Sequence, residues 1–268
     1  NDNIFYELND NNKLIYNGNY LLKNKLGKGT FGSVYVALNN NNNKNVAIKI
    51  YNRNRFCKIY NQNEINVLNE LNTFKKNEQK FFVLKNHMFI HNNFICVELE
   101  LYYVNIYCYN FSLIDTFKIT KQILQAIKIL NKYNIIHSDI KPENILFNPK
   151  NNHIKLIDWG ISIICDKSCE IYMPYEKGII QTLQYKSPEI FSHQEFNNKI
   201  DIWSIGCIFF ELHFGHCMFG GLNDSMIFGD IVNTIKIPNY LTKNNKLYTQ
   251  YLNSSEKSNN SISFNKNI

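Results

Sequence analysis

Apolar and polar positions alternate along the first part of the chain in the manner of β-strands. Tyr20 to Lys25 and Ser33 to Leu38 alternate on either side of a glycine-rich turn, and Asn45 to Tyr51 resumes the alternation after a run of asparagines. Phe81 to Val104 predicts two further strands. The pattern therefore predicts a small lobe built on an antiparallel sheet.

Helical periodicity becomes prominent later. In Asn63 to Leu71 and again in Ile119 to Tyr133, apolar residues recur every three or four positions, as on one face of an amphipathic helix. Strands first and helices later favour an α+β fold with two lobes. We expect a β-rich lobe at about residues 19–101 and a larger, mainly α-helical lobe at about residues 102–252.

Both ends of the chain are polar. Residues 1–18 are rich in asparagine and predict a loose N-terminal extension, and residues 253–268 predict a polar, disordered tail. The folded domain is therefore expected over residues 19–252.

Composition narrows the class of protein. A hydrophobic content of 44% with 14% aromatic residues is ample for a globular core and excludes wholesale disorder. The formal charge of +7 comes almost entirely from scattered lysines, since Arg53 and Arg55 are the only arginines. Direct nucleic-acid binding is not expected, because such proteins rely on arginine and on dense basic stripes.

The chain shows no sign of a membrane span or of a disulfide framework. Its most apolar stretch, Ile200 to Phe214, contains Asp201 and Glu211. The seven cysteines form no paired metal-binding spacing, and no secretory leader is visible, so reduced thiols in the nucleus or cytoplasm are expected. The sequence gives no indication of oligomeric state.

The glycine-rich turn reads GKGTFGSV from Gly27 to Val34, a GxGxxGxV pattern. Glycines in such a turn let backbone N–H groups approach phosphate oxygens without interference from a Cβ. GxGxxG also occurs in dinucleotide-binding folds, where it joins a strand to a helix. Here a strand pattern follows, so a phosphate-binding hairpin or an ordinary tight hairpin fits better.

A lysine ends the apolar run Val46-Ala47-Ile48-Lys49 of the third predicted strand. A lone lysine there is more often a solvated edge residue. Its distance from Gly27 along the chain, however, places it where it would reach α- and β-phosphates beneath the glycine turn. Glu64, on the following helix, is the natural counter-ion; Glu70 is a competitor that does not begin the apolar stripe.

The strongest signal is the run IHSDIKPENIL from Ile136 to Leu146. Asp139, Lys141 and Asn144 supply a proton acceptor, a phosphate-binding cation and a metal ligand from one loop. The apolar strand Ile154 to Ile157 then leads into Asp158-Trp159-Gly160, where a carboxylate can hold Mg²⁺. The whole set in this order is rarely structural coincidence.

From about Tyr20 to Leu241, these motifs resemble the eukaryotic protein-kinase family. Ser187-Pro188-Glu189 resembles the Ala-Pro-Glu that closes the family's activation segment, and Asp201 to Gly206 resembles its DxWSxG helix, whose aspartate braces the catalytic loop. Cys96 to Tyr107 looks like the fifth strand and hinge, with Leu99 as gatekeeper.

The resemblance implies ATP and Mg²⁺ as cofactors and a Ser/Thr hydroxyl of a protein as acceptor. Asp139 would orient the hydroxyl, Lys141 would neutralise the γ-phosphoryl, Lys49 and Glu64 would position the nucleotide, and Asn144 and Asp158 would hold the metal. The residues expected to contact the nucleotide are Leu26, Gly27, Lys28, Gly29, Thr30, Phe31, Gly32, Val34, Ala47, Lys49, Leu99, Glu100, Leu101, Tyr102 and Leu146. Lys141, two places after Asp139, is typical of serine/threonine kinases.

Within the family the chain is most similar to the CMGC group. Ile180 to Glu189 resembles the end of the activation segment in SR-protein kinases and dual-specificity tyrosine-regulated kinases, which implies splicing-factor or other CMGC-type substrates. Arg55-Phe56-Cys57 is similar to cdc2-like kinases, whose LAMMER signature is absent near Ile231 to Pro238. Asp158-Trp159-Gly160 is a variant seen in casein kinase II.

Four departures from the family pattern matter. Ser138 replaces the arginine that grips an activation-segment phosphate, so we expect residues 158–189 to adopt the active form without phosphorylation. Leu183 and Lys186 replace two arginines of CMGC kinases, which argues against proline-directed specificity. Glu189 lacks its usual arginine partner, and an unpaired buried carboxylate is costly. Asp201 lies 67 residues from the end of the 268-residue chain, so an incomplete large lobe is expected, either a fragment or a degenerate lobe.

Three functions compete at this point. An active serine/threonine kinase explains every phosphate, metal and hydroxyl contact of the family. A non-catalytic nucleotide-binding or scaffolding module is favoured by the missing partner of Glu189. A dinucleotide-dependent oxidoreductase is disfavoured by the strand after Gly32.

Overall fold

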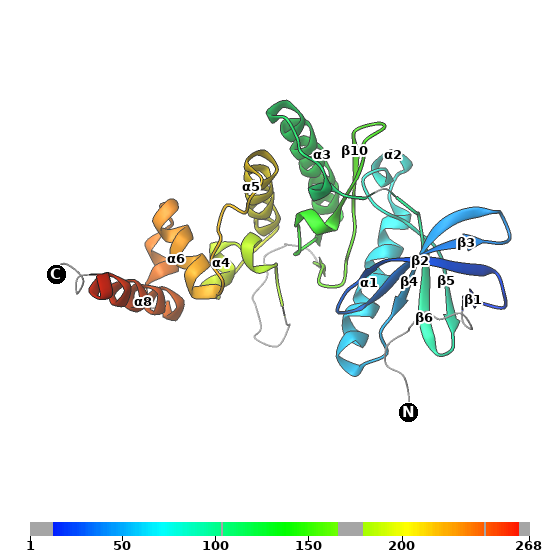
Figure 1. Cartoon of the computed structure of the whole chain (residues 1–268), viewed down its shortest axis with the longest axis horizontal. Helices are drawn as coiled ribbons and strands as arrows, with labels where there is room; N and C mark the ends of the chain where they lie inside the picture. The colour runs from blue at the N-terminus through cyan, green and yellow to red at the C-terminus, as the bar shows by residue number, and fades with distance from the viewer. Residues whose placement is uncertain (1–12, 103, 166–178, 244, 263–268) are drawn as a thin grey trace. The chain divides into compact units, whose positions relative to one another are not determined.

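The computed structural model describes residues 13–102, 104–165, 179–243 and 245–262. The chain forms two compact units (Figure 1). Among the described residues, the N-terminal unit contains those up to 108 together with 143–162, and the C-terminal unit contains those of 109–142 together with those from 163 onward. The first is mainly β-sheet and the second mainly helical, which confirms the predicted α+β class.

The strands are β1 (Leu14–Ile15), β2 (Tyr20–Lys28), β3 (Gly32–Asn39), β4 (Lys44–Tyr51), β5 (Lys85–His91), β6 (Phe94–Leu99), β7 (Val104–Asn105), β8 (Ile135–Ile136), β9 (Ile145–Asn148), β10 (His153–Leu156) and β11 (Ile163–Ile164). The α-helices are α1 (Arg55–Thr73), α2 (Lys76–Gln79), α3 (Leu113–Lys132), α4 (Pro188–Phe191), α5 (Lys199–Phe214), α6 (Asp224–Thr234), α7 (Asn239–Thr242) and α8 (Lys246–Ile262). Short 3-10 turns are η1 (Ile106–Cys108), η2 (Pro142–Asn144) and η3 (Leu183–Tyr185). Within the described ranges, none of the helices combines the length and the apolar character that a bilayer crossing requires.

The C-terminal unit is organised around α5. This helix packs against α3, and its residues Ile200, Ile205 and Ile208 are buried. Gly215 ends the helix with a left-handed φ of 79°, a conformation that glycine adopts without a Cβ penalty. An apolar cluster ties β8 to α4 and α5, and its residues are Ile136, Ile180, Ile190, Phe196 and Ile200.

Helix α8 departs from the sequence prediction. Residues 253–262 are helical, where a disordered tail was expected, and residues 263–268 lie outside the described part of the chain. The helix packs beside α6 (Figure 1). Tyr248 meets Phe228 edge-on at 6.4 Å, and the Asn233 side chain donates a 2.6 Å hydrogen bond to the Tyr251 hydroxyl. Packing of this first part against α6 supplies the stability that a polar helix lacks on its own.

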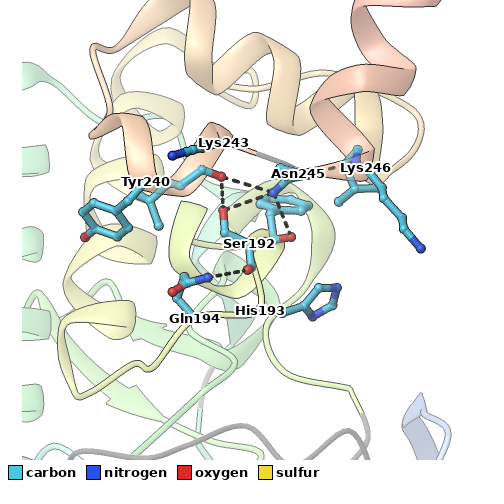
Figure 2. A pocket seen from close by; sticks show the side chains of 10 residues that line it. Ser192, His193, Gln194, Tyr240, Lys243, Asn245 and Lys246 are labelled. Atoms are coloured by element: carbon cyan, nitrogen blue, oxygen red, sulfur yellow. Dashed lines mark hydrogen bonds between the residues drawn. The ribbon is translucent and has the colours of Figure 1, made fainter.

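A cavity of about 400 Å³ lies among α4, α7 and the start of α8 (Figure 2). The Asn245 side chain donates to the Ser192 hydroxyl at 3.2 Å, and that hydroxyl donates to the Leu241 carbonyl at 2.8 Å. These polar groups are therefore engaged by the protein itself. None of the predicted site residues lines this cavity.

The N-terminal unit is built on a six-stranded antiparallel sheet in the order β1-β2-β3-β4-β6-β5. The strands predicted from alternation are present: β2 is three residues longer than expected, β3 gains one residue at each end and β4 gains one, while β5 and β6 lie within the predicted range. Helix α1 begins where the Asn54 side chain accepts a 2.6 Å hydrogen bond from the Cys57 N–H, a side-chain cap, and so starts well before Asn63.

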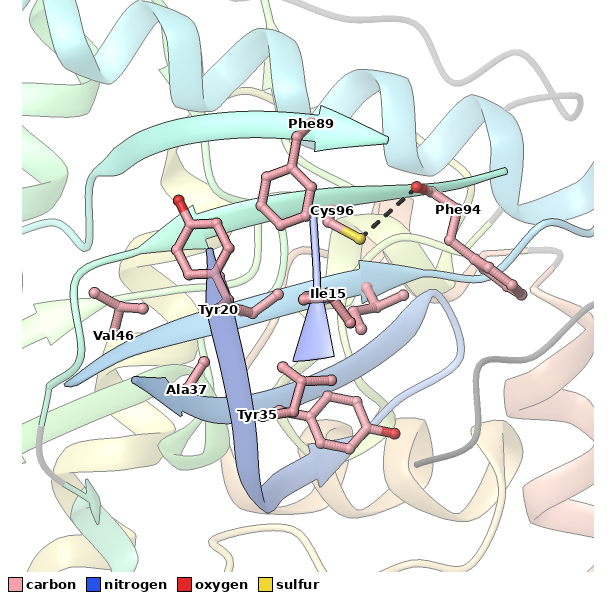
Figure 3. Close-up of a cluster of buried hydrophobic side chains, with 11 residues drawn as sticks. Ile15, Tyr20, Tyr35, Ala37, Val46, Phe89, Phe94 and Cys96 are labelled. Atoms are coloured by element: carbon pink, nitrogen blue, oxygen red, sulfur yellow. Dashed lines mark hydrogen bonds between the residues drawn. The ribbon is translucent and has the colours of Figure 1, made fainter. Parts of the chain in front are cut away.

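One face of the sheet carries the core of this unit (Figure 3). Tyr20 and Phe89 stack at 5.1 Å, and Tyr35, Ile48 and Ile50 are buried beside them. Side chains alternate between the two faces of a strand. Val34, Ala47 and Lys49 therefore point to the face opposite this core.

The predicted loose extension is partly ordered. Strand β1 pairs with β2, and Ile15 is fully buried in the core of the sheet. Two residues are too short for alternation to be visible in the sequence, which explains the error. Residues 1–12 lie outside the described part of the chain.

Residues 143–162 belong to the N-terminal unit and not, as expected, to the helical lobe. The backbone of Leu156 donates to the Phe81 carbonyl at 2.8 Å and accepts from the Val83 N–H at 3.2 Å. Lys155 forms a 2.5 Å ion pair with Glu100. These contacts join β10 to the end of the sheet, so the turn at Asp158 is part of the sheet unit.

Candidate active site

The glycine turn joins β2 to β3, with Gly27 opposite Val34 and the Gly29 N–H bonded to the Gly32 carbonyl at 2.9 Å. A Cβ at Gly32 would lie 2.5 Å from the Ile50 carbonyl oxygen, so the β4 backbone requires glycine there. A Cβ at Gly27 would meet nothing within 4 Å. The protein's own packing therefore leaves open space at Gly27, as a cradle for a phosphate would.

The turn is held from behind by Asn52, a residue that the sequence interpretation missed. Its side chain donates to the Thr30 carbonyl at 2.7 Å, and its backbone N–H donates to the Phe31 carbonyl at 2.8 Å. Because the bonds go to backbone carbonyls, no motif in the sequence indicates them. The loop joins two antiparallel strands and no helix, which removes the basis for the dinucleotide-binding alternative.

Lys49 and Glu64 lie together, as the sequence suggested. The Lys49 ammonium donates to both Glu64 carboxylate oxygens at 2.6 Å, and the Glu64 residue is 2% exposed. Burial works to lower the pKa of Lys49, but the carboxylates of Glu64 and Asp158 outweigh it and hold that pKa above its ordinary value. The competing Glu70 is exposed. Lys49 is therefore a fixed cation.

An apolar strip lies beside Lys49 on the same face of the sheet. Ala47 is paired with Leu99 across β4 and β6, and Val34 is opposite Lys49 on β3. Val34 and Leu99 are partly exposed, and Leu26 is exposed. Cross-strand partners share a face. The strip can accept a flat apolar ring.

The predicted hinge residues follow β6. Glu100 is bound by Lys155, whose ammonium also lies 5.3 Å from the centre of the Tyr102 ring. Leu101, which lies between Glu100 and Tyr102 in the sequence, is half-buried. Leu146, on β9, is paired with Asn105 and Lys155 of the neighbouring strands and is half-buried. All these residues belong to the N-terminal unit.

The two predicted metal ligands lie next to each other. The Ile157 N–H donates to the Asn144 carbonyl at 3.0 Å, and Ile157 immediately precedes Asp158. Asp158 has a left-handed φ of 68°. Its buried Oδ1 oxygen has no hydrogen-bond partner among the described residues and lies 3.7 Å from the Lys49 ammonium. An unbonded buried carboxylate oxygen suits a cation.

A magnesium site would depend on oxygens from a second molecule. Over the described ranges, no group of three or more His, Cys, Asp or Glu side chains could hold a metal ion. Mg²⁺ commonly uses one or two carboxylates together with phosphate oxygens and water. The residue set at Asp158 and Asn144 fits that arrangement and not a closed structural metal site.

In the C-terminal unit, Asp139 and Lys141 share a partner that the sequence interpretation missed. The Thr182 hydroxyl donates to Asp139 Oδ1 at 2.7 Å and accepts from the Lys141 ammonium at 2.9 Å. Lys141 also lies 2.9 Å from Asp139 Oδ2. The three side chains form a closed polar triangle that fixes the acidic and basic groups of the loop.

Asp201 supports the loop that carries Asp139 and Lys141. Its carboxylate accepts the backbone N–H groups of His137 at 2.8 Å and Ser138 at 2.9 Å, and it is fully buried. Burial raises the pKa of Asp201 to about 7, opposed by these two hydrogen bonds, with the Asp139 charge raising it further. Ser138 has a φ of 66°, and the brace supports this uncommon conformation.

A buried glutamine holds the end of the activation segment. Gln181 is 2% exposed, and its side-chain N–H₂ donates to the Ile200 carbonyl at 2.9 Å and the Ser204 hydroxyl at 2.8 Å. Its side-chain oxygen accepts from the Ser187 backbone at 3.0 Å. The Gln181 N–H also bonds the Ser138 carbonyl at 2.9 Å, which ties this segment to the catalytic loop.

Two expectations about the segment's end are corrected or refined. Glu189 is half-buried, so it is not the fully buried, unpaired carboxylate that the sequence suggested, although no described residue bonds its side chain. Lys186 contacts Asp224 at 3.3 Å and lies 5.0 Å from the centre of the Phe191 ring, while Leu183 begins η3. Residues 166–178 of the segment lie outside the described part of the chain.

The fold and these residue groups define a protein kinase domain. The protein kinase domain family model matches residues 20–267, and the chain belongs to this family.

Among its relatives, dual specificity tyrosine-phosphorylation-regulated kinase 2 of Drosophila melanogaster is 34% identical over 251 residues, or 88% of this chain and 33% of the relative. Serine/threonine-protein kinase prp4 of Schizosaccharomyces pombe is 31% identical over 216 residues, or 78% of this chain and 44% of the relative. Human dual specificity tyrosine-phosphorylation-regulated kinase 4 is 32% identical over 228 residues, or 82% of this chain and 42% of the relative. The chain thus spans less than half the length of these relatives, and the resemblance to the CMGC group is confirmed.

Proposed function

We propose that the protein is an active, ATP-dependent serine/threonine kinase that transfers the γ-phosphoryl of Mg-ATP to protein hydroxyls. The observation that carries the proposal is the Lys49 ammonium, held by both oxygens of Glu64 at 2.6 Å beside the unbonded Asp158 oxygen. A lysine fixed in this way beside an open carboxylate suits a bound polyphosphate.

The N-terminal unit would bind the nucleotide. Open backbone at Gly27 would admit phosphate oxygens, Lys49 would neutralise two phosphates, and the strip around Ala47 and Leu99 would take the adenine ring. Asp158 and Asn144 would hold Mg²⁺, which supplies neutralisation of charge on the phosphates.

The C-terminal unit would supply the groups that act on the acceptor. Asp139 would accept or orient the hydroxyl proton, and Lys141 would stabilise charge on the transferred phosphoryl. Thr182 presets both groups by its two hydrogen bonds. Lys141 favours serine and threonine over tyrosine as acceptor.

The substrates that we propose are splicing-factor or other CMGC-type proteins. The name of the prp4 relative denotes a serine/threonine kinase, whereas the names of other relatives denote dual specificity. Tyrosine peptides therefore belong in the assay as a separate arm.

The test is phosphate transfer from radiolabelled ATP with Mg²⁺ to serine, threonine and tyrosine peptides, with wild type beside Asp158→Ala. Asp115→Ala is the matched control, since Asp115 is an exposed carboxylate in the first turn of α3. Transfer by wild type and the control, with loss in Asp158→Ala, supports the proposal. Binding of Mg-ATP without transfer by wild type would instead establish the non-catalytic nucleotide-binding module.

A further inference from the structure

Asn63, the residue before Glu64 on α1, contacts the turn that carries Asp158. Its side-chain nitrogen lies 3.2 Å from the Trp159 carbonyl oxygen, 3.1 Å from that of Gly160 and 2.8 Å from that of Ser162. One amide group therefore faces three carbonyl acceptors of a turn that is about a hundred residues away in sequence.

These contacts matter because residues 158–162 lie between β10 and β11 and belong to neither strand. Backbone carbonyl groups that are removed from water need hydrogen-bond donors. In a turn that follows a residue with left-handed backbone conformation, regular strand pairing does not supply these donors. Asp158 has that left-handed conformation, with φ 68°. The side-chain N–H₂ of Asn63 has two hydrogens, so it can serve these acceptors directly or by sharing. Aspartate or leucine at this position could not.

The same face of α1 makes a second contact with this region. Tyr60, one turn before Asn63, stacks on Phe31 of the glycine loop at 4.8 Å. A Cβ on Gly160 would lie 3.1 Å from the Phe31 ring, so the loop's aromatic residue closes directly over the turn. Residues three apart on a helix share a face. Tyr60 and Asn63 therefore meet the loop and the turn from one surface of α1.

Trp159 holds the other side of the turn. The indole is 1% exposed and packs against Phe82 in an edge-on arrangement at 5.9 Å. The Ser162 N–H donates to the Trp159 carbonyl at 3.1 Å. The buried indole and the carbonyls bonded to Asn63 therefore both restrain the turn that follows Asp158.

We propose that Asn63 is a positioning residue that holds the Asp158-Trp159-Gly160 turn in its metal-presenting conformation. Because Asn63 and Glu64 are adjacent on α1, a displacement of that helix removes the turn's donor and the Lys49 partner together. The position of α1 thus affects both Lys49, which would bind the nucleotide, and Asp158, which would bind the metal. The catalytic consequence rests on the proposed kinase function; the conformational consequence does not.

The conformational test uses Trp159 as a probe. The chain has two tryptophans, and Trp203→Phe leaves Trp159 as the only one. In that background, Asn63→Leu is compared with Asn66→Leu, an identical change at an exposed asparagine on the same helix. We expect acrylamide to quench Trp159 several-fold more strongly in Asn63→Leu, with Asn66→Leu like the parent. Equal quenching in all three proteins overturns the proposal.

The catalytic test measures Mg²⁺ dependence of phosphate transfer at saturating peptide. Loss of a group that orients a metal ligand typically weakens metal binding by about 10- to 100-fold. Asn63→Leu should raise the half-saturating Mg²⁺ concentration by about tenfold or more, without changing KM for the peptide, while Asn63→Gln, which keeps the donor, recovers part of the loss. A uniform fall in kcat with unchanged Mg²⁺ dependence contradicts the proposal.

The two tests separate the failure of this inference from failure of the proposed function. If wild type transfers no phosphate, the kinase proposal fails, and the quenching comparison still decides whether Asn63 holds the turn. If Asn63→Leu does not fold by circular dichroism, Asn63→Ala, which is smaller and also lacks the donor, takes its place under the same criteria.

Discussion

The Thr182 hydroxyl bridges Asp139 and Lys141, with hydrogen bonds of 2.7 and 2.9 Å. Asp139 and Lys141 are two residues apart on one loop, and Thr182 approaches from the end of the activation segment. The segment and the loop are therefore coupled at the groups that we assign to hydroxyl activation and charge neutralisation.

Replacing Thr182 with valine should lower kcat by about 10- to 100-fold, because two hydrogen bonds to charged groups are lost while the shape is kept. Thr182→Ser keeps the hydroxyl and should retain most activity. Steady-state kinetics on the best peptide checks this, with Thr234→Val at the exposed end of α6 as the matched control. A wild-type kcat in Thr182→Val would show that the triangle is dispensable.

The unfolding free energy of the protein should depend on pH because of Asp201. Its folded-state pKa of about 7 lies above the unfolded value near 4. Between about pH 4 and pH 7, the folded protein therefore keeps a proton on Asp201 that the unfolded protein has released. Stability therefore falls as the pH rises from about 4 to about 7. Asp201→Asn should be less stable overall but should lack this slope. Denaturant unfolding across that pH range checks it, and parallel slopes in the two proteins would contradict the assignment.

The buried amide of Gln181 should be worth about 2–4 kcal/mol of unfolding free energy, because Gln181→Leu leaves the Ser187 N–H without its side-chain acceptor and removes one donor to the Ile200 carbonyl inside the protein. Gln184→Leu, at a half-buried position three residues further on, serves as the comparison. Thermal unfolding monitored by circular dichroism gives the answer. Similar Tm values for both variants would mean that the network contributes little.

Activity should not depend on phosphorylation of the activation segment. Ser138 offers no guanidinium to a phosphate, and Gln181 already ties the segment to the loop. Protein treated with phosphatase should transfer phosphate as fast as untreated protein, and so should a variant in which Ser168, Tyr172 and Tyr175 lack their hydroxyls. A loss of activity in either preparation would refute the expectation.

Two glycines of the same turn should respond differently to alanine. Gly32→Ala should destabilise the fold by about 1–3 kcal/mol, because the new methyl collides with the Ile50 carbonyl oxygen. Gly27→Ala meets open space, so its unfolding free energy should change by less than about 0.5 kcal/mol. Its KM for ATP should rise instead. If Gly27→Ala left ATP binding untouched, the proposed phosphate cradle would be wrong.

Much of the fold was readable from the sequence, because alternation and helical spacing are local properties. The strands from Tyr20 to Tyr51 and the helices around Asn63 and Ile119 were predicted, with ends short by several residues. Capping explains part of that error: α1 begins at Arg55 because Asn54 caps it, and a cap carries no apolar periodicity.

The candidate site was readable where residues follow one another and hidden where they meet across the chain. Lys49 and Glu64 were paired from the order of motifs. Thr182 and Asn63 were missed because a side chain that bonds a distant carboxylate or carbonyl leaves no pattern in its own neighbourhood. Helix α8 was missed because Tyr248 and Tyr251, which contact α6 through a ring contact and a hydrogen bond, stand in an otherwise polar stretch.

The path of the chain between the two compact units has a practical consequence for dissecting the protein. The chain changes unit near residues 108, 142 and 162, so each unit is assembled from two separated stretches. A single cut at any of these points therefore yields at least one fragment that contains residues of both units. Asp139 and Asn144 would be divided by a cut at residue 142. Reconstitution from two co-expressed halves therefore cannot give independently folded units, and swapping one unit between homologues requires grafting two segments at once.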